Sequence, residues 1–194
     1  QYLGAEEFRD GISFYLNKHK YGNTETNDLW DAIEHVTQQP ARRIMDSWIF
    51  QKGYPLVSAS ISEDGSTITL SQDRFLYTEG DEPDTTIWSV PIVMKVGTES
   101  GVDEVQYLLE ESSAEIKLDS PAIWASANAG GSGFFRARYS PEMLKALSSS
   151  MFDNLTPIER YGLVDDTWSS VMAGRTSASD FLDFARSFQA ETDL

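Results

Sequence analysis

The sequence contains no cysteine and only two histidines, His19 and His35, among its 194 residues. The lack of cysteine excludes disulfide bridges, thiolate nucleophiles and cysteine metal sites together. A zinc-hydrolase motif of the form HExxH needs two histidines four residues apart on one helix face, and these two are much further apart. We therefore interpret both as packing or surface residues. A metal site shared with another chain stays open as an alternative.

Basic residues are scarce as well. Lys and Arg number 15 against 31 Asp and Glu, which gives a net charge of −16. A surface of this sign repels phosphate backbones and anionic membranes, so nucleic-acid binding is excluded as a function class. The most apolar stretch, Val90–Val96, is interrupted by Pro91 and Lys95 and is far shorter than the roughly 18 residues of a membrane span. We expect neither a nucleic-acid nor a membrane partner, and a cytoplasmic location.

The chain begins with Gln1 rather than Met and has no charged segment followed by an apolar one, so it shows no signal peptide. We expect an internal piece of a longer polypeptide, with removal of a tag or leader as the alternative.

Helical periodicity runs through the first fifty residues. The break at 21–23 separates a first helix from a second, for which Asn27 is the expected N-cap, and Pro40 belongs in the first turn of a third helix that ends before Gly53. The apolar stripe of the first helix consists of Phe8, Ile12, Tyr15, Leu16 and His19. Such short amphipathic helices need a larger body to pack against.

From residue 56 the apolar period changes to two, which predicts strands. Turn chemistry separates them at Glu63–Gly65, Gly80–Pro83 and Asn128–Gly133. Pro91 favours an edge or a bulge in the most apolar strand. The expected strands are 56–61, 67–71, 75–77, 87–96, 105–109, 114–118, 122–124 and 134–139. Strands at this spacing, with no helices between them, predict a small antiparallel β-sandwich.

The last part returns to helix. Ser140 and Thr156 each precede a proline in a helix-start pattern, and Glu159 completes a capping box with Thr156. One helix is expected to turn Tyr161, Val164, Trp168, Val171 and Met172 inward, and the next Phe181, Phe184, Ala185 and Phe188. The predicted fold class is therefore multidomain α and β, with helices at 1–54, a sandwich at 55–139 and the beginning of a helical domain at 140–194. Further helices are expected to cover the apolar faces of the last ones.

Several patterns resemble catalytic or binding motifs without completing them. Ser132 lacks the second glycine of a GxSxG elbow, and the glycines around it precede a strand, where they do not form a phosphate loop. The adjacent pair Asp165 and Asp166 diverges on a helix, so a solvated face or interdomain hydrogen bonds are preferred to an acid/base pair. Trp88 and Trp124 fit a core better than a sugar platform. We expect no catalytic, cofactor-binding or metal-ligating residue in this chain.

The same segments occur in a recognisable order. The chain resembles the aminopeptidase N family of zinc metallopeptidases (gluzincin aminopeptidases). Near the end of that family's catalytic domain the similar segments are FRDGI (8–12), YLNKH (15–19), YGNT (21–24), DLWDA (28–32), IMDSW (44–48) and QKGYP (51–55). QDRFL (72–76), WSVP (88–91) and GFFRARY (133–139) are similar to its sandwich domain, and RYGLVDD (160–166) with Ala173 and Gly174 to the start of its C-terminal helical domain.

The resemblance implies a parent enzyme that uses zinc to release N-terminal amino acids from peptides. The family's zinc helix, its third metal ligand, its GxMEN segment and its catalytic tyrosine would all precede Gln1. This chain would then be a non-catalytic scaffold whose partners are the rest of the parent, its catalytic and C-terminal helical domains, while the parent binds the peptide substrate. The alternative is an independent β-sandwich interaction module that binds a protein or glycan through its strands or the loop Asn128–Gly133.

Overall fold

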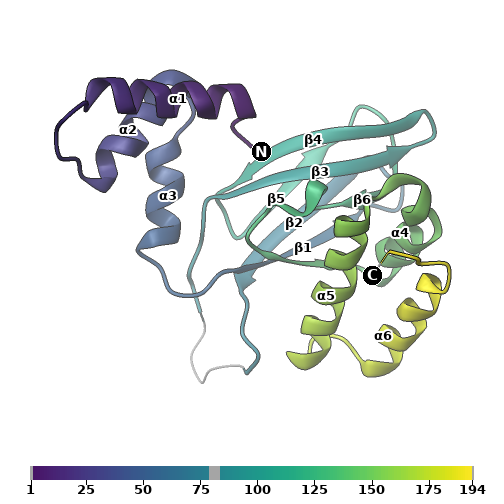
Figure 1. Ribbon diagram of the computed structural model, residues 1–194. Helices are drawn as coiled ribbons and strands as arrows, with labels where there is room; N and C mark the ends of the chain where they lie inside the picture. Colours follow the sequence, from purple (N-terminus) through teal and green to yellow (C-terminus); the bar gives the residue numbers. More distant parts are fainter. Residues whose placement is uncertain (1, 79–83, 194) are drawn as a thin grey trace.

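The computed structural model describes residues 2–78 and 84–193. The chain forms three helices, two sheets and then a second group of helices (Figure 1). This order agrees with the predicted fold class. The turn expected at Gly80–Pro83 lies outside the described residues. No helix in the described part of the chain is both long and apolar enough to span a bilayer.

The N-terminal helices are α1 (Ala5–Lys18), α2 (Thr26–Thr37) and α3 (Ala41–Ile49). Gly11 of α1 lies against Ile33 of α2, where a Cβ on the glycine would come within 3.1 Å of the Ile33 backbone. A larger residue at this position would push the two helices apart. Glu25 and Asp28 form a capping box at the start of α2, so Asn27 is not its N-cap as predicted.

The predicted stripe of α1 is only partly covered: Phe8 and Leu16 remain 48% and 60% exposed. Pro40 is the N-cap of α3 and stands one residue before the position expected for it.

Two sheets pack face to face. The first has the strand order β5-β2-β1-β7 and the second the order β4-β3-β6. Their strands are β1 (Pro55–Ile61), β2 (Thr67–Arg74), β3 (Val90–Thr98), β4 (Gly101–Leu109), β5 (Ser113–Lys117), β6 (Ala122–Ser126) and β7 (Arg136–Tyr139). All pairs are antiparallel except β1 with β7, which run parallel. The sandwich is therefore antiparallel apart from this single pair.

Several predicted strand ends are shifted by a few residues, as in β3 and β4, and two strand predictions are wrong in kind. Residues 75–77 form no strand, because the chain leaves the sheet after Arg74, and Phe75 instead stacks on Tyr54. Pro91 lies in β3, which is the central strand of its sheet rather than an edge, and the bulge falls at Gly97 and Thr98. Proline is tolerated there because β6 pairs only with 95–98, so Pro91 faces a neighbouring strand on one side alone.

The C-terminal helices are α4 (Pro141–Asn154), α5 (Pro157–Met172) and α6 (Ala178–Ala185), followed by the 3-10 turn η2 (Arg186–Phe188). Another 3-10 turn, η1 (Ala129–Gly131), lies between β6 and β7. One apolar core fills the sandwich around Trp88, Ile92 and Met94. A second core lies between the helices and the β6 side of the sandwich, and contains Trp124, Leu147, Met151, Leu155, Leu163 and Phe184.

Candidate functional site at the sandwich–helix junction

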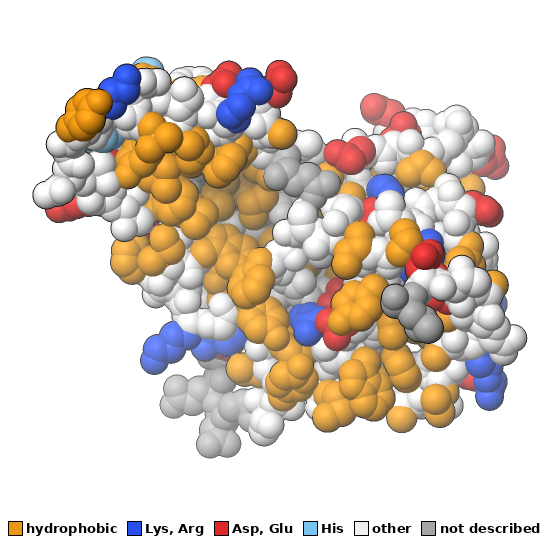
Figure 2. Space-filling model, viewed as in Figure 1, with side chains coloured by type: hydrophobic (Ala, Val, Ile, Leu, Met, Phe, Trp, Pro, Cys, Tyr) orange, Lys and Arg blue, Asp and Glu red, His pale blue; other side chains and the backbone are white. Residues whose placement is uncertain are grey.

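Helix α5 buries a mainly polar face, to which Leu163 contributes an apolar side chain. Glu159, Arg160 and Asp166 are each at most 8% exposed, whereas Tyr161 and Trp168 are 65% and 47% exposed. The predicted inward face is therefore wrong for Tyr161, Trp168 and Met172, whereas Val164 packs against the core that contains Leu163. The reason is that the sandwich presents charged and polar partners to the polar face, and the apolar face lies toward the surface (Figure 2).

Glu159 is the centre of this junction. One carboxylate oxygen accepts hydrogen bonds from the Lys95 ammonium (2.8 Å) and from the backbone N–H and hydroxyl of Thr156 (2.6 and 2.8 Å). The other oxygen accepts from the Gly130 N–H at 2.7 Å. Burial alone would raise the pKa of Glu159, but these donors outweigh it and the pKa is lowered. One carboxylate thus connects α5, β3 and η1.

A second ionic cluster lies beside the first. Arg136 of β7 donates to Asp165 and, at 3.0 Å, to Asp166, whose other oxygen accepts the Ala137 N–H at 3.0 Å. Burial raises the pKa of Asp166 to about 6, even though both hydrogen bonds act in the opposite direction. The two aspartates therefore form hydrogen bonds between the sandwich and the helices, one of the two roles preferred for them from the sequence.

Two further groups complete the junction. The Tyr139 hydroxyl accepts the Ala127 N–H at 3.0 Å, and burial raises the pKa of Tyr139 to about 12. Arg160 donates to the Leu155 carbonyl and makes a two-pronged contact with Glu191 at 2.6 and 2.8 Å. Paired donors of this kind fix direction as well as distance. Arg160 thereby holds the segment after η2 against α5.

The N-terminal helices meet the sandwich through neutral hydrogen bonds, aromatic contacts and one ion pair. The Trp48 indole N–H donates to the Ser89 carbonyl at 3.0 Å, and the Ser89 N–H donates to the Ser47 hydroxyl at 3.0 Å. The Trp48 ring lies 6.4 Å from Trp88 and 6.1 Å from Phe134, measured between centroids. An ion pair joins Arg43 to Glu110 at 3.0 Å, with Arg43 62% exposed.

The loop Asn128–Gly133 belongs to the junction. The Asn128 side chain bonds both the N–H and the carbonyl of Gly133, and Glu159 holds Gly130. Gly130 and Gly131 have φ values of 68° and 64°, which favours glycine at both positions. Ser132 stands beside these two residues, and it is here a loop residue rather than part of a nucleophile elbow.

The other residues singled out from the sequence have structural positions. His35 is exposed and stacks on Phe14, with 4.7 Å between ring centroids, while His19 packs against Tyr15 on another helix. Trp88 and Trp124 are both buried as predicted, but Trp124 belongs to the core beneath the helices rather than to the sandwich interior. Asp64 accepts hydrogen bonds from Ser62 and Ser66 in its turn.

Sequence reasoning missed the role of Glu159 and Lys95. Glu159 was interpreted only as a capping residue, and Lys95 only as an interruption of an apolar strand. The signal for a buried ion pair was a lysine on an otherwise apolar strand together with a glutamate at the start of a helix. Each of these charges needs a partner when it is buried. Nothing in the local pattern shows that these two meet across 64 residues.

Chemically, this junction is a set of saturated polar contacts. Its carboxylates accept hydrogen bonds from lysine, arginine and backbone donors. Among residues 2–78 and 84–193, no three His, Cys, Asp or Glu side chains come together as a metal site would require. The arrangement is suited to holding two layers in a fixed relation.

Comparison with known proteins identifies the context of this junction. Residues 1–48 match the Peptidase family M1 domain, and residues 124–194 match the ERAP1-like C-terminal domain. The chain is 32% identical to the puromycin-sensitive aminopeptidase of Caenorhabditis elegans, with 99% of the chain and 21% of that protein aligned. It is 37% identical to tricorn protease-interacting factor F2 of Thermoplasma acidophilum and 34% identical to aminopeptidase M1 of Arabidopsis thaliana. Those alignments each cover 99% of the chain and 23% of the relative.

The chain thus spans about a fifth of the length of the curated relatives it matches. The two family matches follow the order of the resemblance seen in the sequence, with the peptidase domain first and the C-terminal domain, whose match begins within β6, after it. Relatives from animals, plants and archaea align along nearly all of it. The chain belongs to the aminopeptidase N (M1) family of peptidases.

Proposed function

We propose that this chain is the non-catalytic scaffold segment of a zinc-dependent aminopeptidase that releases N-terminal amino acids from peptides in the cytoplasm. In this proposal residues 1–54 are the last helices of the catalytic domain, 55–139 the sandwich domain and 140–194 the start of the C-terminal helical domain. The segment keeps the parts of the parent on either side of it in a fixed relation. Its partners are those remaining domains, and the peptide substrate binds to the parent.

The observation that carries this proposal is the polar junction around Glu159. A carboxylate with four donors on its two oxygens holds α5 against β3 and η1 in one orientation, because each hydrogen bond restricts direction. Such a contact tolerates little sliding, unlike an apolar surface. The loop Asn128–Gly133, which a free interaction module would use for binding, is itself occupied by this junction.

Within residues 2–78 and 84–193, the side chains of this chain do not fit a zinc site. His19 and His35 stand on different helices and contact aromatic rings, and the carboxylates of the junction already have cationic or backbone partners. The zinc of the proposed parent therefore belongs to another part of the polypeptide, and no catalytic step is assigned to the residues described here.

The first experiment tests the isolated chain. We expect the purified 194-residue chain, incubated with zinc, to release no 4-nitroaniline from alanine 4-nitroanilide or leucine 4-nitroanilide. Release at a rate proportional to chain concentration, abolished by a chelator, would refute the non-catalytic assignment.

The second experiment tests the scaffold role in the complete parent. We expect Glu159→Ala to lower kcat/KM for the same substrates at least tenfold while the zinc content stays at one ion per chain. The exposed Glu142→Ala on α4 is the matched control and should keep the wild-type rate. If Glu159→Ala retained full activity, the junction would not position the parts of the enzyme.

A further inference from the structure

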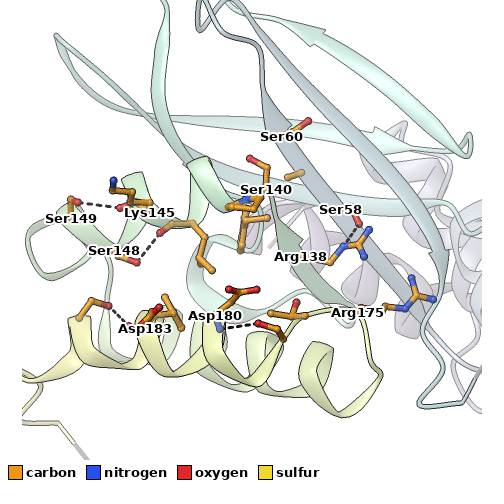
Figure 3. A pocket seen from close by; sticks show the side chains of 18 of the residues that line it. Ser58, Ser60, Arg138, Ser140, Lys145, Ser148, Ser149, Arg175, Asp180 and Asp183 are labelled. Carbon is orange, nitrogen blue, oxygen red and sulfur yellow. Dashed lines mark hydrogen bonds between the residues drawn. The ribbon is translucent and has the colours of Figure 1, made fainter.

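A groove with a volume of about 880 Å³ lies between the outer face of the sheet and the C-terminal helices. Strands β1, β2 and β7 form one wall, and α4, α6 and the turn before α6 form the other (Figure 3). This volume falls within the range of small-molecule and peptide pockets. Of the residues assigned to the junction around Glu159, Tyr139 also lines the groove.

Arg138 of β7 lines this groove and differs from every other arginine. The other eight each form an ion pair with a carboxylate, namely Arg9, Arg42, Arg43, Arg74, Arg136, Arg160, Arg175 and Arg186. Within residues 2–78 and 84–193 Arg138 has no such partner, and its side chain donates one hydrogen bond, from Nε to the Ser58 hydroxyl at 3.2 Å. In a chain of net charge −16 this leaves the two terminal nitrogens of a half-buried guanidinium open to an external carboxylate.

The wall beside Arg138 also carries the hydroxyls of Ser60 and Ser71, which have no hydrogen-bond partner among the described residues. Ser60 of β1 faces Thr69 of β2 in register, and Ser58 faces Ser71. No hydrogen bond of the described residues uses the side chains of Ser60 or Ser71, whereas Ser148 on the opposite wall is bonded to its own helix. Hydroxyls both donate and accept, so this row matches the alternating N–H and C=O groups of a peptide main chain.

An acidic group faces the same space from α6. Figure 3 shows Asp180 and Asp183 directed into the groove from the helix, with Arg138 and Arg175 toward one end. Asp183 pairs with Arg186 and Arg175 pairs with Asp73, each within 3.0 Å. Asp180 has no cationic partner among the described residues. The groove therefore presents two cations without a carboxylate partner among the described residues, the half-buried Arg138 on β7 and the exposed Lys145 on α4, and one unpaired carboxylate, Asp180.

We propose that this groove binds a short peptide whose terminal carboxylate is held by the guanidinium of Arg138 and whose amino group lies toward Asp180. Phosphate is a poorer fit than a carboxylate, because the unpaired Asp180 repels a dianion more strongly than a monoanion. The bound peptide would touch the sandwich and α6 at once, and so stabilise their arrangement. The proposal needs no hydrolysis by any part of the parent, so it stands or falls independently of the proposed function.

The test is calorimetric titration of the 194-residue chain with tetra-alanine, with NMR amide shifts to locate the contact. We expect binding to weaken at least tenfold when the peptide carboxylate is amidated or when Arg138 is replaced in Arg138→Met. Arg138→Lys keeps the positive charge but loses the paired N–H donors of the guanidinium. It should therefore bind more tightly than Arg138→Met and more weakly than wild type. Asp180→Asn should weaken the binding of tetra-alanine with a free amino group and leave the affinity for N-acetylated tetra-alanine unchanged.

Lys117→Met, an exposed lysine on β5 with no ion pair among the described residues, controls for the loss of one positive charge. The peptide-amide comparison uses the wild-type chain, so it remains decisive if Arg138→Met fails to fold. Equal binding of tetra-alanine and its amide would overturn the proposal, as would shifts that map away from β1, β7 and α6. The proposal would also be overturned if inorganic phosphate displaced tetra-alanine with equal affinity, because the groove would then bind anions without selecting a peptide.

Discussion

The sandwich is joined to helices on two sides, and the two joints use different chemistry. On the C-terminal side, buried charges meet: Lys95 with Glu159 at 2.8 Å, and Arg136 with Asp166 at 3.0 Å. On the N-terminal side, Trp48 makes an indole hydrogen bond and ring contacts, and the ion pair of Arg43 is largely exposed. The first joint is directional and saturated, while the second is mainly aromatic packing.

The two groups of helices also differ in which apolar side chains they leave exposed to solvent. Figure 2 shows apolar side chains gathered over the N-terminal helices and again over α5 and α6. Phe50 on the N-terminal side is 80% exposed, and Tyr161 on α5 is 65% exposed. Because α5 directs its charged face to the sandwich, its apolar face is available for another contact. A helix can thus be fixed on both faces, by charge on one and by apolar burial on the other.

Replacing Glu159 should damage the charged joint most. Glu159→Ala leaves Lys95 without its carboxylate and leaves the N–H groups of Gly130 and Thr156 without an acceptor. Breaking one side of a buried pair costs about 3–5 kcal/mol. We expect a loss of that size in the free energy of unfolding, measured by urea denaturation at pH 7. Glu142→Ala should cost less than about 1 kcal/mol. Equal losses in the two variants would show that the buried Glu159 contributes no more to stability than an exposed glutamate.

Trp48→Ala tests the aromatic joint. The change removes the bond to Ser89 and the contacts with Trp88 and Phe134, and for a partly buried tryptophan we expect a cost of about 2–3 kcal/mol. Hydrogen exchange should quicken in α1–α3 and stay slow in α4–α6. Trp168→Ala, on the exposed face of α5, is the control. Uniform acceleration along the whole chain would show that the two joints are not separate.

The pH dependence of stability separates two carboxyls of the charged joint. The pKa of Asp166 is raised from 3.8 to about 6, so the folded state holds this proton more tightly than the unfolded state. Its contribution is complete below pH 3.8 and is lost as the pH rises toward 6, on the order of 2 kcal/mol. The lowered pKa of Glu159 acts oppositely, and its contribution is lost as the pH falls.

We expect the difference in unfolding free energy between wild type and Asp166→Asn to change by about 2 kcal/mol between pH 4 and pH 7. Above pH 7 this difference should stay constant. Asp165→Asn, beside it on α5, controls for the loss of one carboxylate. A difference that stayed constant across the range would mean that burial does not govern the titration of Asp166.

Local patterns predicted the element order and the sandwich because each depends on neighbouring residues. The capping box of Thr156 with Glu159 and the strand period around Ile92 and Met94 are examples. The inward face of α5 could not be predicted in this way. Its apolar side is the usual choice for burial, but the partners Lys95 and Arg136 of its polar side lie far off in sequence and become neighbours only after the chain folds.

The same limit applies to the candidate sites. The role of Asp165 and Asp166 between sandwich and helices was among the expectations because adjacent aspartates on a helix cannot converge on one atom. Arg138 gave no signal, because its distinguishing property is the lack of a carboxylate partner, and that depends on the whole surrounding surface. The sequence predicted what each segment becomes, and the contacts between segments required the structure.

The smallest effect is expected from the charge on the aromatic side. Arg43 pairs with Glu110 at 3.0 Å, but Arg43 is 62% exposed and Glu110 33%, so water competes with the pair. Exposed pairs contribute about 0.2–1 kcal/mol to stability. We expect Arg43→Gln to lower the free energy of unfolding, measured by urea denaturation, by an amount near the lower end of this range. The loss should vanish in 0.5 M salt, which screens the pair. A loss comparable with that of Glu159→Ala would show that the N-terminal joint is also electrostatic, because exposure would then not decide what a charge contributes.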